Sequence, residues 1–424
     1  MKLSITWRIF IGLVLGVIVG YVVHMSYDSG SPADQETLAT WSKNLQIISK
    51  VFLRMIKMII GPLVFSMLVV GIAKLGDFKM VGRIGGKTLG YFLFATILSL
   101  LTGLAVVNVL KPGKVMQLPL PATGTDTGIE AKKFSLESFM YHIFPQSIIE
   151  SMAGNEILQI VVFSIFFGIA TAAIGDAGKV VVKGLDAVSH VMFKIVSYVM
   201  NFAPFGVFGA IAAVVATEGL GIFAGYAYLI FSFFLGLAFF VFIVLWIICL
   251  VNKIPYFKLL SLVKDPALLT FSTASSEASM PQTIEALKKY GCSEKIISFV
   301  LPLGYSFNLD GSMMYMTFAT AFIAQAYGKD LSTAQQLTML ATLMLSSKGI
   351  AGVPRASLVI IAGTMTMFDL PIEGLALLLG IDQILDMGRS ATSVIGNAVA
   401  TAVVSKWEGE LDLRKLHSSE ELSV

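Results

Sequence analysis

Residues 271–281 read FSTASSEASMP, a run of serines and other small residues inside an otherwise hydrophobic part of the chain. Residues 346–357, SSKGIAGVPRAS, form a second tip of the same kind. Each tip lies between two short apolar segments and precedes a long run that contains an acidic residue. Lipid cannot satisfy an open backbone, so such tips must be buried in protein or line a watery cavity. Paired half-spans are typical of a secondary transporter's binding site. The alternative is an ordinary extramembrane turn at each tip.

The composition of the whole chain indicates a membrane protein. Of its 424 residues, 56% are hydrophobic and 13% are charged, whereas about a quarter are charged in soluble domains. The mean hydropathy is +0.82. The net charge of +3 is too small to indicate a nucleic-acid partner, and two cysteines and four histidines support neither a disulfide framework nor a metal site. We therefore predict an all-α polytopic membrane protein in contact with lipid.

Apolar runs long enough to cross a bilayer lie near 9–25, 46–73, 88–110, 157–174, 185–216 and 220–251. The first run follows a basic start but lacks a small-residue cleavage site, so we interpret it as a span and not as a signal peptide. Pro204 is expected to kink the fifth run. Lysine and arginine collect after the second span and near 179–183 and 253–264. The positive-inside rule then predicts a cytoplasmic N-terminus and an external loop at 112–135.

The segment DQILDMGRSATSVIGN (382–397) carries charges where a simple span would have none. Asp382, Asp386 and Arg389 fall at i, i+4 and i+7 of a predicted helix and share one face. The next two turns of that face carry Ser390, Ser393 and Asn397. Such a face suits a zwitterionic or anionic ligand, with Asp386 for an ammonium group and Arg389 for a carboxylate. Asp382 is the weaker candidate, since it lies a turn nearer the start of the span. The alternative is a structural Asp–Arg pair that locks helices together.

The first tip carries Ser275, Ser276 and Glu277. Half-helix N-termini at such a tip expose unpaired amides, which bind a carboxylate without a cation. Ionisable residues inside a membrane are functional by default, and burial favours the neutral form of a carboxyl group. Glu277 is therefore a candidate proton carrier. The alternative is a solvated glutamate at a hairpin tip.

The segment YSFNLDGS (305–312) interrupts a helix and supplies oxygen atoms from Asn308, Asp310 and Ser312. It predicts a weak cation site at Asn308 and Asp310, and Gly304 and Asn397 are further candidate members of that site. The alternative is a helix-breaking Asx turn. The Met-rich run 313–316 is interpreted as packing or lipid-facing side chains. The sequence contains no GxSxG, HExxH or P-loop pattern that would favour an enzyme.

The order of the serine-rich tip, NLDGS, GIAGVP and GIDQILDMGR…GN resembles the dicarboxylate/amino acid:cation symporters, the glutamate transporter family. The similarity covers nearly the whole chain, including IKMIIGPLVFSMLVVGIAKLGD (56–77). It implies eight transmembrane helices, two re-entrant hairpins, inverted repeats and a homotrimer, in which a transport domain moves past a scaffold like an elevator. The implied scaffold is 1–83 (spans 1–2) and 112–216 (outer loop, spans 4–5). The implied transport domain is 84–111 (span 3), 217–254 (span 6) and 255–408 (both hairpins, spans 7–8), followed by a cytoplasmic tail at 409–424.

The resemblance also implies roles for single residues. Asp386 matches the aspartate that holds the substrate's amino group, and Arg389 matches the arginine that holds its side-chain carboxylate. Ser276 and the backbone around Val353 match the carboxylate-binding hairpin tips. Ser312 and Ser390 match neighbouring hydroxyl positions of the family's site. Because the C4-dicarboxylate branch typically lacks the amino-binding aspartate, Asp386 favours an amino acid, and Arg389 favours an acidic one.

Several positions depart from the sodium-coupled members of the family. Asn397 stands where they have an aspartate, and Phe92 and Ala95 stand where the third span supplies a tyrosine and a threonine to a sodium site. Ala274 replaces the hairpin arginine of archaeal members, and the SSE sequence is similar to that of proton-coupled bacterial members. These departures favour protons, with Glu277 as the carrier, over sodium.

Two further departures concern the substrate. Ser393 replaces a substrate-binding asparagine. Arg355 lies in the expected outer gate, where it either contacts an anionic substrate or pairs with Glu277. These two alternatives stay open.

The leading hypothesis is a proton-coupled symporter for glutamate or aspartate in a bacterial-type inner membrane, with both termini in the cytoplasm and no bound cofactor. The alternatives within the family are a sodium-coupled amino acid symporter and a carrier of C4-dicarboxylates or neutral amino acids. A channel or a membrane-embedded receptor belongs to a different class, and accumulation of substrate against its gradient would exclude both. An enzyme is disfavoured because no nucleophile and base are paired in these clusters.

Overall fold

The computed structural model describes residues 5–27, 31–75, 78–116, 120–121, 141, 143–219, 226–347 and 356–414. The N-terminal part forms α1 (Ile5–Tyr27), α2 (Pro32–Leu75), α3 (Phe78–Leu110) and α4 (Pro112–Val115). The middle part forms α6 (Ile148–Gly154), α7 (Ile157–Ala173), α8 (Asp176–Val199), a 3₁₀ turn (Met200–Phe202) and α9 (Ala203–Glu218). A π-helical turn (Phe240–Val244) joins α11 (Ala227–Phe239) to α12 (Leu245–Val251).

The C-terminal part contains the interrupted segments. It forms α13 (Tyr256–Thr273), a 3₁₀ turn (Glu277–Ser279), α14 (Met280–Tyr290), α15 (Glu294–Phe307) and α16 (Asp310–Ala326). It continues with α17 (Thr333–Ser346), α18 (Ala356–Met367), a 3₁₀ turn (Ile372–Leu375), α19 (Ala376–Leu379) and α20 (Asp382–Trp407). Apart from an isolated bridge between Cys292 and Leu411, the regular structure of these described residues is helical.

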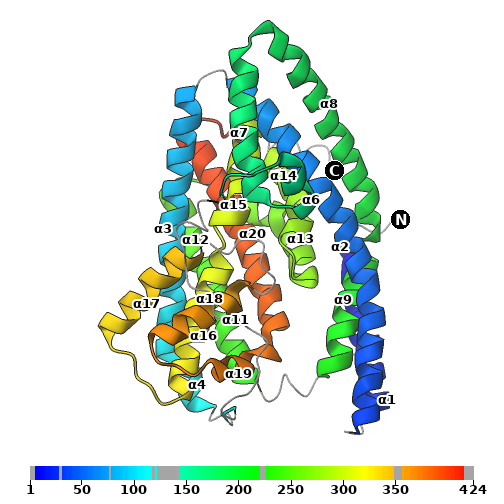
Figure 1. Cartoon of the computed structure of the whole chain (residues 1–424), viewed down its shortest axis with the longest axis vertical. Coiled ribbons are helices and arrows are strands. Elements are labelled where there is room, and N and C mark those ends of the chain that lie inside the picture. The colour runs from blue at the N-terminus through cyan, green and yellow to red at the C-terminus, as the bar shows by residue number, and fades with distance from the viewer. Residues whose placement is uncertain are drawn as a thin grey trace.

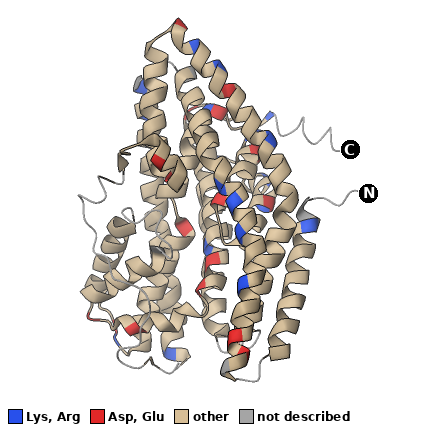
Figure 2. Cartoon of the chain, turned by 45° about the vertical axis from the view of Figure 1, so that its right-hand side comes forward, with Lys and Arg blue, Asp and Glu red and all other residues tan. Residues whose placement is uncertain are grey.

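Five stretches of the described residues are long and apolar enough to cross a membrane: Trp7–Tyr27, Ala33–Ala73, Lys79–Val115, Asp176–Thr217 and Ala227–Val251. They confirm five of the predicted apolar runs as helices, and the sixth run, 157–174, corresponds to the shorter α7. α2 starts fourteen residues before the predicted run. The prediction missed these first turns because they are polar. The predicted bend at Pro204 appears as the 3₁₀ turn directly before it. Figure 2 shows long stretches of helix without a charged residue.

The helices pack as two groups (Figure 1). In the first group, α1 packs along α9, and α2 packs on α7, α8 and α9. In the second group, α16 packs on α3 and α20, and α20 also contacts α13 and α15. Contacts of α15 with α2 and α7, and of α13 with α9, join the groups. The interface between α1 and α9 is close because Gly12, Gly16 and Gly20 recur every four residues on α1, and a Cβ atom at Gly12 would lie 2.4 Å from the carbonyl oxygen of Pro204.

The interrupted segments take different forms. The first tip is a hairpin, because α13 ends at Ala274 in the left-handed conformation (φ 49°) and α14 returns along α13. Its second arm is amphipathic and not apolar throughout, with Glu285, Lys288 and Lys289 on α14. Of the second tip, 346–357, residues 348–355 lie outside the described residues. Between α15 and α16 the helix breaks at Asn308 and Leu309, whereas α20 runs unbroken through the segment 382–397.

α20 lies at the centre of the second group, and most of its residues from Asp382 to Ser405 are buried. Its C-terminal end contacts α3, because Glu408 forms ion pairs with Arg83 Nη2 and with Lys87 Nζ, each at 2.7 Å. Trp407 Nε1 also donates to Asn252 Oδ1 at 2.7 Å. These contacts fix the helix that carries the candidate site.

Candidate substrate site

The charged face predicted for 382–389 forms a compact cluster on the first two turns of α20. The Arg389 guanidinium donates from Nη1 to Asp382 Oδ1 at 3.0 Å and from Nε to Asp386 Oδ1 at 2.7 Å. The side chains of Arg389 and Asp382 are 5% and 8% exposed, whereas that of Asp386 is 30% exposed. Ser390 Oγ donates to the same Asp386 oxygen at 3.1 Å. Two carboxylates therefore hold one arginine, and Asp386 is the member that stays open to a ligand.

Tyr315 of α16 also belongs to this cluster and contacts both Arg389 and Asp382. Its hydroxyl donates to Asp382 Oδ1 at 3.0 Å, and its ring centroid lies 4.4 Å from the Arg389 Cζ atom. The side chain is fully buried. Interpreting the run 313–316 as bland packing missed this residue, because its role depends on how α16 crosses α20. Tyr315 is a positioning residue that supports Arg389 through a cation–π contact and through Asp382.

A Tyr315→Phe variant tests this positioning. It keeps the ring but removes the hydrogen bond to Asp382, and hydrogen bonds to charged groups contribute about 1.5–3 kcal/mol. We expect substrate affinity in the purified protein to fall roughly tenfold or more, with the protein still folded. Tyr315→Leu, which also removes the ring, should weaken binding further. Unchanged affinity in both variants, measured by calorimetry, would remove Tyr315 from the site.

A cavity of about 400 Å³ opens beside the cluster and lies between the two helix groups. The second group contributes Asp382, Asp386, Arg389, Ser312 of α16 and Ser357 of α18. The first group contributes Gln46 of α2, with Val214 and Thr217 of α9. Ionised, the two acids and one arginine give the lining a formal charge of −1. The cavity is large enough for a small amino acid or dicarboxylate.

Ser393, predicted to face the substrate, lies instead between two backbones. Its hydroxyl accepts a hydrogen bond from the Gly311 amide at 3.1 Å and donates to the Arg389 carbonyl at 2.9 Å. A Cβ atom at Gly311 would lie 2.0 Å from that carbonyl oxygen, so only glycine allows α16 to approach α20 this closely. Ser393 is fully buried and is not part of the described lining of the cavity.

The first hairpin tip lies apart from this cavity. Ser275, Ser276 and Glu277 are half-buried and do not belong to its described lining. The Ser276 carbonyl accepts a hydrogen bond from Ser279 Oγ at 3.0 Å, which closes the turn. The 3₁₀ turn Glu277–Ser279 packs against α2. The other predicted gate residues, Val353 and Arg355, lie outside the described residues.

The four residues of the predicted cation site lie together. Asn308 Nδ2 donates to Asp310 Oδ2 and to Asn397 Oδ1, each at 3.1 Å, and all three side chains are buried. A Cβ atom at Gly304 would lie 2.3 Å from Asn397 Oδ1. The sequence reading missed Ser99 of α3, whose hydroxyl donates to the Asp310 carbonyl. Asp310 contributes a carboxylate to this cluster, and the described residues contain no group of three or more acidic, histidine or cysteine side chains that could hold a metal ion.

Comparisons with known proteins agree over nearly the full length of the chain. The profile of the sodium:dicarboxylate symporter family matches residues 5–407. The chain is 41% identical over 419 residues to a proton/sodium-glutamate symport protein of Geobacillus stearothermophilus, which covers 98% of this chain and 97% of the relative. It is 39% identical over 418 residues to a C4-dicarboxylate transport protein of Bacillus subtilis, with 97% and 95% covered. It is 38% identical over 422 residues to a proton/glutamate-aspartate symporter of Escherichia coli, with 98% and 95% covered.

Proposed function

Because the chain belongs to the sodium:dicarboxylate symporter family, we propose that it is a proton-coupled symporter that takes up glutamate or aspartate. Membership of this family makes the chain a multi-pass membrane transporter and not an enzyme. The relatives at about 40% identity carry names of both glutamate symporters and C4-dicarboxylate transporters. The choice between these substrates therefore rests on the site itself.

The observation that carries the proposal is the pairing of a partly open carboxylate, Asp386, with a buried arginine beside one cavity. An amino acid brings an ammonium group that Asp386 can accept and a carboxylate that Arg389 can bind. A C4-dicarboxylate brings two negative charges and no ammonium group, so it would add −2 to a lining with a formal charge of −1 and offer no cation to Asp386. This charge balance favours an acidic amino acid.

The same balance supports coupling to a cation. Glutamate with a net charge of −1 would enter a lining with a formal charge of −1, and like charges in a poorly solvated cavity repel strongly. A co-transported cation removes that penalty. Protons are favoured over sodium because Asn397 adds an amide and not a carboxylate to the Asp310 cluster, while Glu277 offers a protonatable carboxyl at the hairpin tip. Sodium coupling remains the competing hypothesis, and Asp310 and Asn308 would hold that ion.

We further propose that the two helix groups are the scaffold and the transport domain of a homotrimer with eight spans and two re-entrant hairpins. The grouping of α1, α2, α7, α8 and α9 apart from the remaining long helices supports this division. The cavity between the groups gives the substrate a path that opens when one group moves. The orientation proposed from the lysines and arginines puts both termini in the cytoplasm, with the protein in a cell inner membrane.

The deciding experiment is uptake into proteoliposomes under an imposed pH gradient with sodium absent. We expect labelled glutamate to accumulate against its gradient, and we expect unlabelled aspartate to compete better than succinate, serine or cystine. Uptake that requires a sodium gradient would overturn proton coupling. Stronger competition by succinate would assign the protein to C4-dicarboxylates.

Asp386→Asn tests the assignment of the ammonium site. The variant removes the charge that the ammonium group needs but keeps the shape of the side chain. Because hydrogen bonds to charged groups contribute about 1.5–3 kcal/mol, we expect glutamate affinity to fall roughly tenfold to 100-fold. Succinate affinity should stay equal or rise, since it has no ammonium group. Normal glutamate transport in this variant would exclude Asp386 from the site.

A further inference from the structure

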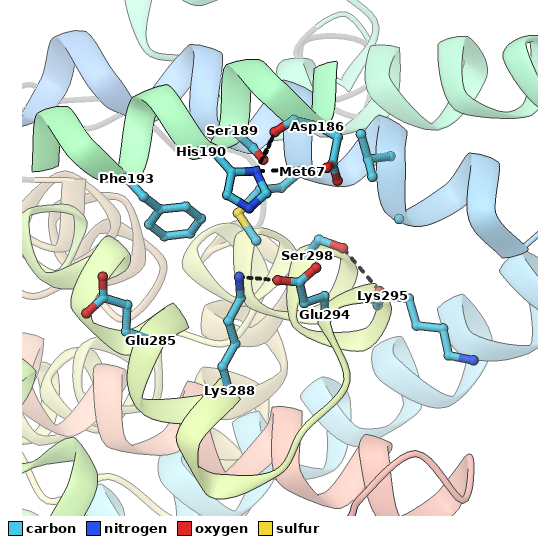
Figure 3. Close-up of a pocket in the computed structure, with 12 residues that line it drawn as sticks. Met67, Asp186, Ser189, His190, Phe193, Glu285, Lys288, Glu294, Lys295 and Ser298 are labelled. Atoms are coloured by element: carbon cyan, nitrogen blue, oxygen red, sulfur yellow. Dashed lines mark hydrogen bonds and ion pairs between the residues drawn. The ribbon is translucent and has the colours of Figure 1, made fainter. Parts of the chain in front are cut away.

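A crevice of about 280 Å³ lies between the two helix groups (Figure 3). It shares no lining residue with the substrate cavity. On α2 the substrate cavity is lined by Gln46, whereas this crevice is lined by Met67, Val70 and Gly71. At 1.5 Å per residue, Gln46 and Met67 are about 30 Å apart along the helix. The crevice is therefore a separate feature at the end that the proposed orientation places in the cytoplasm.

One wall of the crevice belongs to α8 and the opposite wall belongs to α14 and α15. Lys288 of α14 joins these walls, because its Nζ atom lies 4.7 Å from the ring centroid of Phe193 of α8. Lys288 also forms an ion pair with Glu294 of α15, which holds the ammonium group in place. A cation over an aromatic face is attracted by the ring quadrupole. This cation–π contact therefore links the two helix groups directly across the crevice.

On the α8 wall, Ser189 and His190 both contact Asp186 of the same helix. His190 Nδ1 lies 2.8 Å from the Asp186 carbonyl oxygen and 3.9 Å from its carboxylate. Figure 3 shows the His190 and Phe193 side chains on the α8 wall, with Lys288 reaching up from α14. Lys288 thus contributes the cross-group contact that depends on the relative position of α8 and α14.

α2 forms the floor of the crevice. α2 contributes the apolar side chains of Met67 and Val70, and at Gly71 it has no side chain at all. A Cβ atom at Gly71 would lie 2.5 Å from Ser298 Oγ of α15, so the two helices approach directly there. The contact between Lys288 and Phe193 adds a directional interaction above this apolar floor.

We propose that Lys288 and Phe193 form a latch that holds the two helix groups in the arrangement of Figure 1, and that the latch opens whenever the transport domain moves. This inference rests on the proposed function, since it assumes that the groups move relative to each other. Glu294 is the positioning residue of the latch. Its ion pair keeps the Lys288 ammonium group over the ring and away from solvent-exposed rotamers.

The test measures the distance between spin labels on exposed positions of the two groups, Lys179→Cys on α8 and Lys258→Cys on α13, in proteoliposomes. Both buried native cysteines, Cys249 and Cys292, are replaced by alanine, and uptake is measured in parallel. One of the measured distances corresponds to the arrangement in Figure 1. Lys288→Met and Phe193→Leu should each lower the ratio of molecules with this distance to molecules with other distances about two- to fivefold. The double variant should show no larger effect than either single variant. Phe193→Trp, which offers the best ring for a cation, should increase the same population.

Lys289→Met is the matched control, because it removes the neighbouring exposed lysine on the same helix and should leave the distances unchanged. The latch is overturned if Lys288→Met has no effect while substrate still shifts the distances, or if the effects of the two single variants multiply. A single distance that ignores substrate in actively transporting protein overturns both the latch and the moving transport domain. Absence of uptake in the unmutated protein contradicts the proposed function itself.

Discussion

An Arg389→Met variant is expected to lose uptake of every acidic substrate, by more than about 100-fold. In the folded protein Arg389 donates to Asp382 at 3.0 Å and to Asp386 at 2.7 Å, in a nearly solvent-free position. Removing one partner of a buried ion pair costs about 3–5 kcal/mol, because the remaining charge is left uncompensated. The variant also removes the group that we propose for the substrate carboxylate. Initial rates of labelled glutamate and succinate uptake in proteoliposomes measure both effects together.

A second variant separates binding from folding. Asp382→Asn combined with Arg389→Met removes one positive and one negative charge, so the cluster keeps its net charge. We expect the thermal unfolding temperature of this double variant to recover most of what Arg389→Met loses, while uptake stays at background. Arg389→Lys keeps a cation but not the fork of donors that reaches two carboxylates, so it should bind substrate weakly. Recovery of uptake in the double variant would show that Arg389 has only a structural role.

Glu277→Gln is expected to abolish proton-driven accumulation while leaving exchange of internal for external substrate intact. Glutamine keeps the size and hydrogen-bonding capacity of glutamate but has no proton to release near neutral pH. Glu277 lies half-buried at the start of the turn that packs against α2, where it would change surroundings if the hairpin moved. The measurement compares uptake driven by a pH gradient with counterflow in the same vesicles.

Glu285→Gln on the second arm of the same hairpin is the matched control. Glu285 is exposed, so neutralising it should leave both activities unchanged. Undiminished pH-driven uptake in Glu277→Gln would exclude this residue as the proton carrier. Loss of exchange as well as accumulation would show that Glu277 contributes to substrate binding.

The sequence was informative wherever the chemistry lies on one helix. The i, i+4, i+7 spacing of Asp382, Asp386 and Arg389 depends only on helix geometry, so their shared face could be predicted and the structure brings the three together. Both interpretations of that face, a ligand site and a structural Asp–Arg pair, describe part of the structure. Arg389 forms ion pairs with both carboxylates, and the cluster lines a cavity. The apolar runs were predictable for the same reason, because each span depends on its local composition.

Contacts between helices could not be predicted in this way. Tyr315 reaches Asp382 from another helix, and nothing in the run 313–316 indicates the angle at which that helix crosses α20. Ser393 shares the predicted face but lies where α16 crosses α20. Its hydroxyl there accepts a hydrogen bond from the Gly311 amide. Asp382 was expected to be the weaker candidate for the ligand, and in the structure it is the buried carboxylate that contacts both Arg389 and Tyr315.

The glycine at the crossing of α16 and α20 has a consequence for how this protein can diversify. A Cβ atom at Gly311 would lie 2.0 Å from the carbonyl oxygen of Arg389. A Cβ atom at Gly396 would lie 1.9 Å from Asp310 Oδ2. A side chain at Gly311 would displace the backbone of Arg389, and one at Gly396 would displace the carboxylate of Asp310. New substrate preferences are therefore accessible through residues that line the cavity, such as Asp386 and Ser312, and are closed off at the crossing. A library designed to retarget the carrier should randomise the first set and hold the glycines constant.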